Sequence, residues 1–193
     1  MSKQDLQSSV ELFAWTAREL PIRFLGDELL KTVCQPVGKQ EFATNDVKKI
    51  ADELLAVLTK YREHTGMGRG LAANQIGYNK RMVAVWLDQK PEVFCNPEVV
   101  SSDGLGSYWE SCISSGALLV GEVYREWTAN FRYCDTSGKE HIFEADEKQT
   151  RVLLHEIDHL DGITCNEKYQ AKTEKIVTGG KEEILGFKFK QIA

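Results

Sequence analysis

The segment from Asp146 to Gly162 constrains the fold of this chain most strongly, because it combines a helix start, an apolar stripe and two histidines. Asp146 followed three residues later by Gln149 is typical of a capping box, and Gly162 is placed to end the helix. Apolar residues recur at helical spacing between these ends, at Val152, Leu153, Ile157 and Leu160. The segment therefore predicts a half-buried amphipathic helix.

The same helix carries a pattern that is typical of metal hydrolases. Residues 155–159 read His-Glu-Ile-Asp-His. Positions i and i+4 share one face of a helix, so His155 and His159 can direct ring nitrogens at one divalent ion while Glu156 reaches its water. Such a string can also be a solvated polar face without a metal. The apolar stripe favours the metal, because half-buried imidazoles without partners would be costly.

Length and composition are those of one ordinary globular domain. The 193 residues are 42% hydrophobic and 27% charged, and they carry a net charge of −5. No basic stripe indicates a nucleic-acid surface. No apolar run approaches a membrane span, and the first 20 residues lack the pattern of an export signal. We therefore expect a cytoplasmic location, without a membrane or nucleic-acid partner.

The five cysteines are odd in number and scattered, which predicts reduced thiols rather than a disulfide framework. They are Cys34, Cys95, Cys112, Cys134 and Cys165.

A metal site with two histidines needs a third protein ligand and an open position for water. Cys112, in a short segment with polar flanks, is the best candidate. The alternative is that Cys112 is a small buried hydrophobe, the commoner role of a free cysteine.

The remaining segments predict an α+β fold. Thr44 or Asn45 begins a helix that Gly66 ends. The other expected elements are a weak helix over 9–20, a loop-rich arm over 21–43, strands over 82–87 and 93–95, a turn at Asn96-Pro97, a hairpin of 127–133 and 139–143, and an edge strand over 185–189. Strands gathered between helices predict antiparallel or mixed sheets packed around a central metal-binding helix, in a single domain.

The glycine-rich segment 66–77 does not have the pattern of a phosphate loop, because no Lys-Ser/Thr pair follows its glycines. Glycines at a strand edge allow close backbone approach, so an extended peptide could pair there. Gln75 would supply a neutral amide donor nearby. A flexible loop is an equally good interpretation of the composition alone.

Three ordered motifs together resemble the peptide deformylase family. That family carries G-x-G-L-A-A-x-Q, E-G-C-L-S and H-E-x-D-H, and this chain has counterparts at 68–75, 110–114 and 155–159. The likeness covers about residues 22–165. It predicts one deformylase-like domain over 1–193, with an N-terminal extension at 1–21 and a C-terminal tail at 166–193.

The resemblance implies a hydrolase that removes the N-formyl group from the terminal methionine of new polypeptides and releases formate, meeting the ribosome only in passing. Cys112, His155 and His159 would bind a divalent metal ion, natively ferrous iron and often replaced by zinc, nickel or cobalt. Glu156 would carry protons, and the Gln75 amide and the Ile113 backbone N–H would stabilise the developing oxyanion. The residues expected to bind substrate are Gly68, Arg69, Gly70, Ser111 and Arg125.

Several residues depart from the family pattern. Ser111 stands where the family usually has glycine, and Ile113 where it has leucine. Both replacements change the space available beside the metal. Arg69 replaces an aliphatic residue near the methionine pocket, so strict methionine preference is in doubt and an acidic first residue is favoured. Arg125 is expected on the peptide-binding rim, with a solvated strand-edge arginine as the alternative.

Two other functions are compatible with parts of the sequence. In a zincin-type peptidase the third ligand would lie downstream of the helix, at Glu167, Glu182 or Glu183. A deformylase-like protein without activity would keep the fold as a peptide-binding module. The presence of Glu156 and Gln75 argues against this inactive peptide-binding module, because a structural metal site needs neither residue.

Overall fold

The structure is a computed structural model that describes residues 9–87, 90–186 and 189–193. Its helices are α1 (Ser9–Glu19), α2 (Asn45–Thr65), α3 (Glu147–Leu160) and α4 (Lys181–Gly186). Its strands are β1 (Gly70–Ala72), β2 (Met82–Leu87), β3 (Lys90–Ser111), β4 (Leu119–Cys134), β5 (Glu140–Ala145), β6 (Lys175–Ile176) and β7 (Lys190–Gln191). Within these described residues, no helix is long and apolar enough to cross a membrane.

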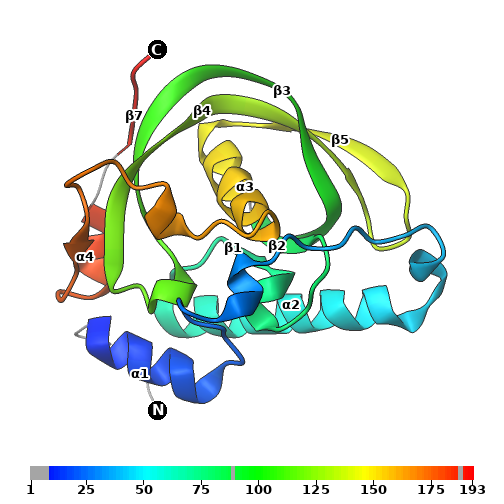
Figure 1. Cartoon of the computed structure of the whole chain (residues 1–193), viewed down its shortest axis with the longest axis horizontal. Helices are drawn as coiled ribbons and strands as arrows, with labels where there is room; N and C mark the ends of the chain where they lie inside the picture. The colour runs from blue at the N-terminus through cyan, green and yellow to red at the C-terminus, as the bar shows by residue number, and fades with distance from the viewer. Residues whose placement is uncertain (1–8, 88–89, 187–188) are drawn as a thin grey trace.

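The strands form one sheet in the order β1-β2-β3-β4-β5, with β6 beside β4 and β7 beside β3. Every pairing between these strands is antiparallel. The long strands β3 and β4 curve together over α3, as Figure 1 shows. The predicted single-domain α+β fold is confirmed, and its sheet is antiparallel rather than mixed.

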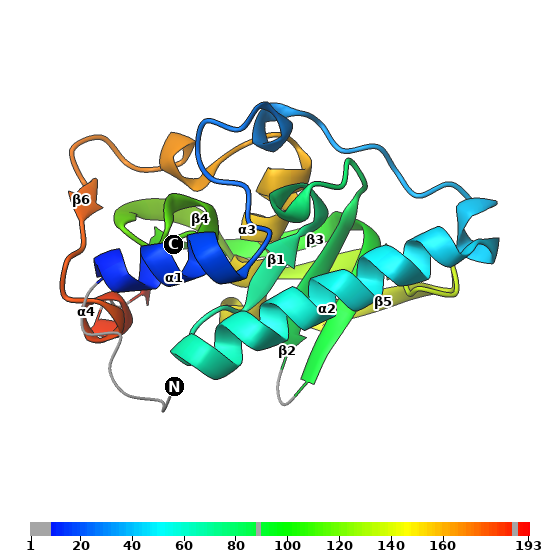
Figure 2. The ribbon, with the colours of Figure 1, turned by 90° about the horizontal axis from the view of Figure 1, so that it is seen from below.

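Strand β2 separates two hydrophobic cores. Met82 and Ala84 pack on the side of α2, whereas Val83 and Val85 pack on the side of α3. Figure 2 shows α2 lying across one face of the sheet, with α3 behind it. Because both faces of β2 are buried, its sequence is a continuous apolar run rather than an alternating one. The predicted range of 82–87 is confirmed.

The two long helices begin and end where their capping residues predict. Thr44 caps α2 through its side-chain oxygen, and Gly66 ends that helix in the left-handed conformation with φ of 69°. The Asp146 carboxylate accepts hydrogen bonds from the backbone N–H groups of Lys148 and Gln149 at 2.9 and 2.8 Å. The predicted capping box of α3 is therefore confirmed.

The turn predicted at Asn96-Pro97 is wrong. Both residues lie inside β3, where the register with β4 shifts between Cys95 and Glu98. Pro97 has no N–H to donate, so the ladder is interrupted there, but the strand continues because β4 pairs again beyond it. Asn96 bonds to the backbone of Val37 in the arm, at 2.8 Å to its N–H and 2.9 Å to its carbonyl.

The edge strand predicted over 185–189 is not found at the described residues of that range, and the strand of the C-terminus begins just beyond it. Leu185 belongs to the short helix α4, and Phe187 lies outside the described residues. Strand pairing begins at β7, which joins β3 at Gly106 and Ser107. The alternation over 185–189 was too short to separate a strand from one helical turn.

Candidate active site

Three donor atoms from two distant segments meet in the interior. Cys112 follows the end of β3, and His155 and His159 stand one turn apart on α3. Their ligand atoms all lie within 4.8 Å of one another, and all three side chains are buried. The Cys112 Sγ and the His159 Nε2 are 3.2 Å apart. The structure thus brings together the three residues that the sequence predicted as ligands.

The donor set fits one divalent metal ion. Metal–nitrogen and metal–sulfur bonds of about 2.1 and 2.3 Å require donor atoms a few ångströms apart. The neighbouring Cys165 thiol and burial raise the pKa of Cys112, so a cation would be needed to hold it as a thiolate. Burial and the nearby His155 lower the pKa of His159, which keeps a lone pair available for a metal.

Glu110 orients the first histidine. Its Oε2 accepts a hydrogen bond from His155 Nδ1 at 2.9 Å, which leaves His155 Nε2 to face the metal site. Burial alone would raise the pKa of Glu110, but Arg125 and His155 hold it well below its ordinary value. No role for Glu110 was predicted from the sequence. Its position two residues before Cys112 in an extended segment, and therefore on the same face, could have indicated one.

Glu156 lies on the wall beside the metal donors. Its side chain is buried, and its Oε2 has no hydrogen-bond partner among the described residues. Burial raises the pKa of Glu156 to about 7. A carboxylate with a pKa near neutrality is suited to taking a proton and returning it.

Gln75 is held in one orientation by its neighbours. Its Oε1 accepts a hydrogen bond from the Ala72 N–H at 2.7 Å. Its Nε2 donates to Ser114 Oγ at 3.0 Å and lies 3.4 Å from Cys112 Sγ. One amide hydrogen is thus directed to Ser114 and the other toward the Cys112 sulfur, beside the place where an oxyanion would form.

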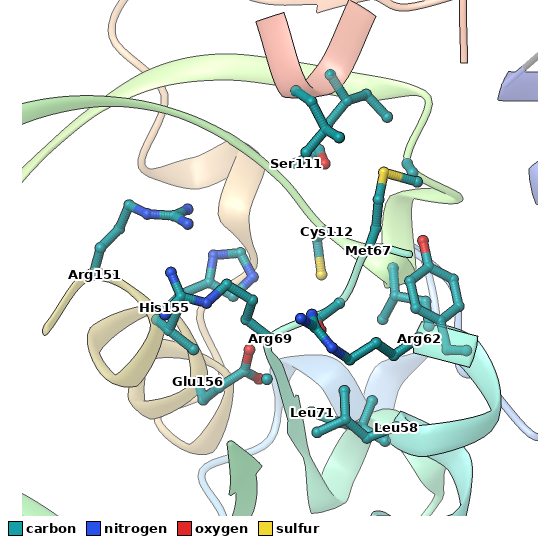
Figure 3. Close-up of a pocket in the computed structure, with 18 of the residues that line it drawn as sticks. Leu58, Arg62, Met67, Arg69, Leu71, Ser111, Cys112, Arg151, His155 and Glu156 are labelled. Atoms are coloured by element: carbon teal, nitrogen blue, oxygen red, sulfur yellow. The ribbon is translucent and has the colours of Figure 1, made fainter. Parts of the chain in front are cut away.

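A cavity of about 430 Å³ opens beside these groups. It brings together most of the residues that the sequence predicted for catalysis and substrate binding, which are Gly68, Arg69, Gly70, Gln75, Ser111, Cys112, Ile113, His155 and Glu156. Figure 3 shows Cys112, His155 and Glu156 around its inner part. His159 lies deeper and does not line it.

The sequence model of the family described as polypeptide deformylase matches residues 19–175. The chain belongs to the polypeptide deformylase family. Members of this family are metal-dependent hydrolases, so a divalent ion is implied at the Cys112–His155–His159 cluster. The resemblance that the three motifs indicated is therefore confirmed.

Relatives and solved structures agree with this family. The peptide deformylase of Thermus thermophilus is 32% identical over 184 residues, which cover 86% of this chain and 91% of the relative. That of Thermoanaerobacter pseudethanolicus is 34% identical over 149 residues, covering 76% of this chain and 87% of the relative. The crystal structure of the Thermotoga maritima peptide deformylase superposes with a TM-score of 0.70 at 28% identity, covering 77% of this chain and 96% of that one.

The rim position expected for Arg125 in this deformylase is wrong, and so is the solvated alternative. The Arg125 side chain is buried and does not line the cavity. Its guanidinium bonds to Glu110 at 2.7 and 2.8 Å and to Asp158 at 2.7 Å. Arg125 therefore connects the carboxylate that orients His155 to the metal-binding helix. An arginine on a strand can face inward when a buried and a half-buried carboxylate meet it, which the sequence pattern did not reveal.

The zincin alternative is not favoured in this deformylase. Glu167 bonds to the N–H and hydroxyl of Thr164 at 2.8 and 2.9 Å and pairs with Lys31. Glu183 accepts from the Gly179 N–H at 2.8 Å. Within the described ranges, the group of candidate ligands is Cys112, His155 and His159, so neither glutamate nor Glu182 supplies the third donor.

Two basic residues of the deformylase cavity were not predicted from the sequence. Arg62 and Arg151 line it together with the predicted Arg69. Arg151 precedes His155 by four residues, so it lies one turn earlier on the same face of α3. That spacing was present in the sequence, but nothing in it placed the cavity on the N-terminal side of the histidines.

We expect Gly70→Ala to impair the deformylase activity of this chain. A Cβ at this position would lie 2.6 Å from Glu156 Cγ, so the carboxylate would have to move. A displacement of about 1 Å can cost about 10² in rate. The measurement is kcat with a formylated peptide, together with metal content. The control is Gly186→Ala in α4, where an added Cβ meets nothing within 4 Å. Equal activity of the two variants would contradict the placement of Glu156.

Proposed function

We propose that this chain hydrolyses the formamide at the amino terminus of newly made polypeptides, giving formate and a free amine. The observation that carries the proposal is a buried carboxylate on the wall of the cavity, Glu156, close to a cluster of three metal donors of which two also line that cavity. The oriented amide of Gln75 supports it further, because a purely structural metal site has no use for such a donor.

In the proposed site, Cys112, His155 and His159 hold one divalent ion. A bound ion would supply Lewis-acid chemistry, lowering the pKa of a water molecule to about 7 and polarising the formyl oxygen. Ferrous iron is the proposed native ion, with zinc, nickel and cobalt as replacements. Two imidazoles and one thiolate suit each of these metals.

The remaining residues handle the proton and the developing charge. Glu156 accepts a proton from the attacking water and delivers it to the leaving nitrogen as the carbon–nitrogen bond breaks. The Gln75 amide and the Ile113 backbone N–H donate to the formyl oxygen as negative charge develops there. One such donor is worth about 10²–10³ in rate.

The substrate peptide lies along the cavity in an extended form. Gly68, Arg69, Gly70 and Ser111 line it. Strand β1 stands at the end of the strand order and pairs with β2, so its other edge can accept a further strand. Nascent chains are the proposed source of the formylated terminus, so we place the reaction in the cytoplasm, with passing contact to the ribosome.

The test is formate release from a formyl-Met peptide by iron-loaded protein prepared without oxygen. We expect release by the wild-type protein, and loss of both metal and activity in Cys112→Ser, because the hydroxyl is a poor ligand. Cys134→Ser is the matched control, since Cys134 does not line the cavity and is not one of the clustered donors. Unchanged metal content in Cys112→Ser would contradict the ligand assignment. If the wild-type protein releases no more formate than Glu156→Ala, the result would instead favour a peptide-binding module without activity.

A further inference from the structure

Three residues of the C-terminal tail line the active-site cavity. They are Ile184 and Leu185 of α4 and Phe189, which stands one residue before β7. In Figure 3 the ribbon of α4 runs along the upper edge of the cavity, opposite Leu58 and Leu71 at its lower edge. None of the three tail residues takes part in the proton transfer or the charge stabilisation of hydrolysis. Their place in the cavity therefore calls for a different role.

Bonds on both sides of these residues tie the tail to the rest of the domain. Before them, the Gly180 N–H donates to Ser9 Oγ of α1 at 3.1 Å. After them, β7 pairs with β3, and the Leu105 N–H donates to the Ala193 carbonyl at 2.7 Å. Ile184 also packs against the core on the side of α2. The lining residues are thus held at the cavity from both flanks.

Strand register places Phe189 beside the end of β3 that leads to the metal site. Ser107 pairs with Lys190, so the antiparallel register puts Phe189 opposite Tyr108. The two rings stack with their centres 5.6 Å apart. Tyr108 and Cys112 are four residues apart in extended chain, and their side chains therefore point to the same face. Phe189 adjoins the face from which Cys112 reaches the metal site.

Leu185 and Phe189 are large, apolar and yet exposed, with exposed fractions of 59% and 40%. Among the large exposed apolar side chains of the described ranges, these two are the ones that line the cavity. Apolar surface that is left uncovered inside a binding cavity favours an apolar ligand, because covering it removes that surface from water. The two side chains thus offer a contact surface for an apolar part of the substrate.

We propose that Phe189 and Leu185 bind the side chain of the first substrate residue, and that the C-terminal tail thereby strengthens the preference for methionine. The inference rests on the proposed function, since it concerns the substrate of the same site. With the formyl group at the metal donors, the neighbouring methionine side chain extends along β3 to the Phe189 ring. A thioether is unbranched and polarisable, and it makes favourable contacts with an aromatic ring. An alanine at the same place has no atoms that reach this surface.

The test compares kcat/KM of the wild type and Phe189→Ala on two formylated tripeptide amides whose first residue is Met or Ala. We expect the wild type to prefer the Met peptide, and Phe189→Ala to lower the Met-to-Ala ratio by about tenfold, mainly through a higher KM for the Met peptide. The ratio cancels a general loss of activity, because both peptides share the same metal and proton chemistry. An unchanged ratio, with formate released from the Met peptide, would overturn the proposal. Formate from neither peptide with the wild type would instead contradict the proposed function.

Ile192→Ala is the matched control. Ile192 is also an apolar tail residue, is 43% exposed and does not line the cavity. Its variant should keep the wild-type ratio. Leu185→Ala should lower the ratio as Phe189→Ala does, and Phe189→Leu, which keeps an apolar side chain, should retain part of it. An equal fall of the ratio in Ile192→Ala and Phe189→Ala would assign the effect to the tail as a whole and overturn the role of Phe189.

A binding measurement decides the question where a variant is inactive. Calorimetric titration of metal-loaded protein with the product peptide Met-Ala-Ser amide gives Kd without turnover. We expect Phe189→Ala to weaken this Kd by about tenfold and Ile192→Ala to leave it unchanged. Equal Kd values for the wild type and Phe189→Ala would overturn the proposal. A final arm exchanges Ala for Leu at the second residue. If Phe189→Ala changes the response to that exchange and not to the first residue, the assignment to methionine is wrong.

Discussion

Glu156→Gln is expected to lower kcat for formate release by about 10²–10⁴-fold, the usual contribution of a positioned general acid–base. The amide has the shape of the carboxylate but cannot take a proton from water or return it to the leaving amine. Metal content should not change, because Glu156 is not one of the clustered donors. The measurements are single-substrate kinetics on a formyl peptide and the metal-to-protein ratio.

Stability should not fall in this variant. Burial raises the pKa of Glu156 to about 7, so its ionised form is disfavoured in the folded protein. Its Oε2 has no hydrogen bond to lose among the described residues. A midpoint of urea unfolding equal to or above that of the wild type is therefore expected. Activity within tenfold of the wild type, at full metal loading, would refute the role of Glu156 as proton carrier.

Arg125→Met is expected to destabilise the protein by about 3–5 kcal/mol, the usual cost of removing one partner of a buried ion pair. The change would leave Glu110 buried without its cation, since the paired side chains are only 3% and 0% exposed. Asp158 would lose the same partner. Urea unfolding measures the loss. Metal affinity should weaken as well, because Glu110 orients His155.

Arg132→Met is the matched control for this change. Arg132 also lies on β4 and pairs with a glutamate of β3, at 2.6 Å from Glu98, but these side chains are 47% and 57% exposed. Removing an exposed pair costs at most about 1 kcal/mol. Equal destabilisation by the two variants would contradict the structural role of Arg125.

The pH dependence gives a second check on Arg125. Arg125 and His155 hold the pKa of Glu110 below its ordinary value of 4.5. A depressed carboxyl pKa contributes stability that is present above the unfolded pKa and lost as the pH falls toward the folded pKa. The stability difference between wild type and Arg125→Met should therefore be full above about pH 4.5 and narrow below it.

Local pattern was sufficient for the main helices and the central strand. Thr44, Gly66 and Asp146 cap helix ends through bonds that span only a few residues, so their effect is visible in sequence. Strand β2 was identified from one apolar run. The C-terminal edge strand was less certain, because α4 and β7 are each only a few residues long and depend on what they pack against.

Arg125 and Arg151 mark where pattern failed. Each looked like an ordinary polar position of a strand or helix, yet Arg125 is enclosed by Glu110 and Asp158 and Arg151 faces the active-site cavity. The partners of Arg125 lie 15 and 33 residues away in the chain. Which charges meet across such separations depends on strand register and helix placement, not on local spacing.

By itself, the sequence determined the chemistry available on α3, because helical geometry places His155, Glu156 and His159 within one turn of one another. It also supplied Cys112 and Gln75 as candidates. Only the tertiary structure decided that these two side chains reach the histidines, that Glu110 orients His155, and that Arg69 and Arg151 share the cavity. The physical reason is separation along the chain. Contacts within one turn follow from backbone geometry, whereas contacts between β3, β1 and α3 form only once the two cores bring those elements together.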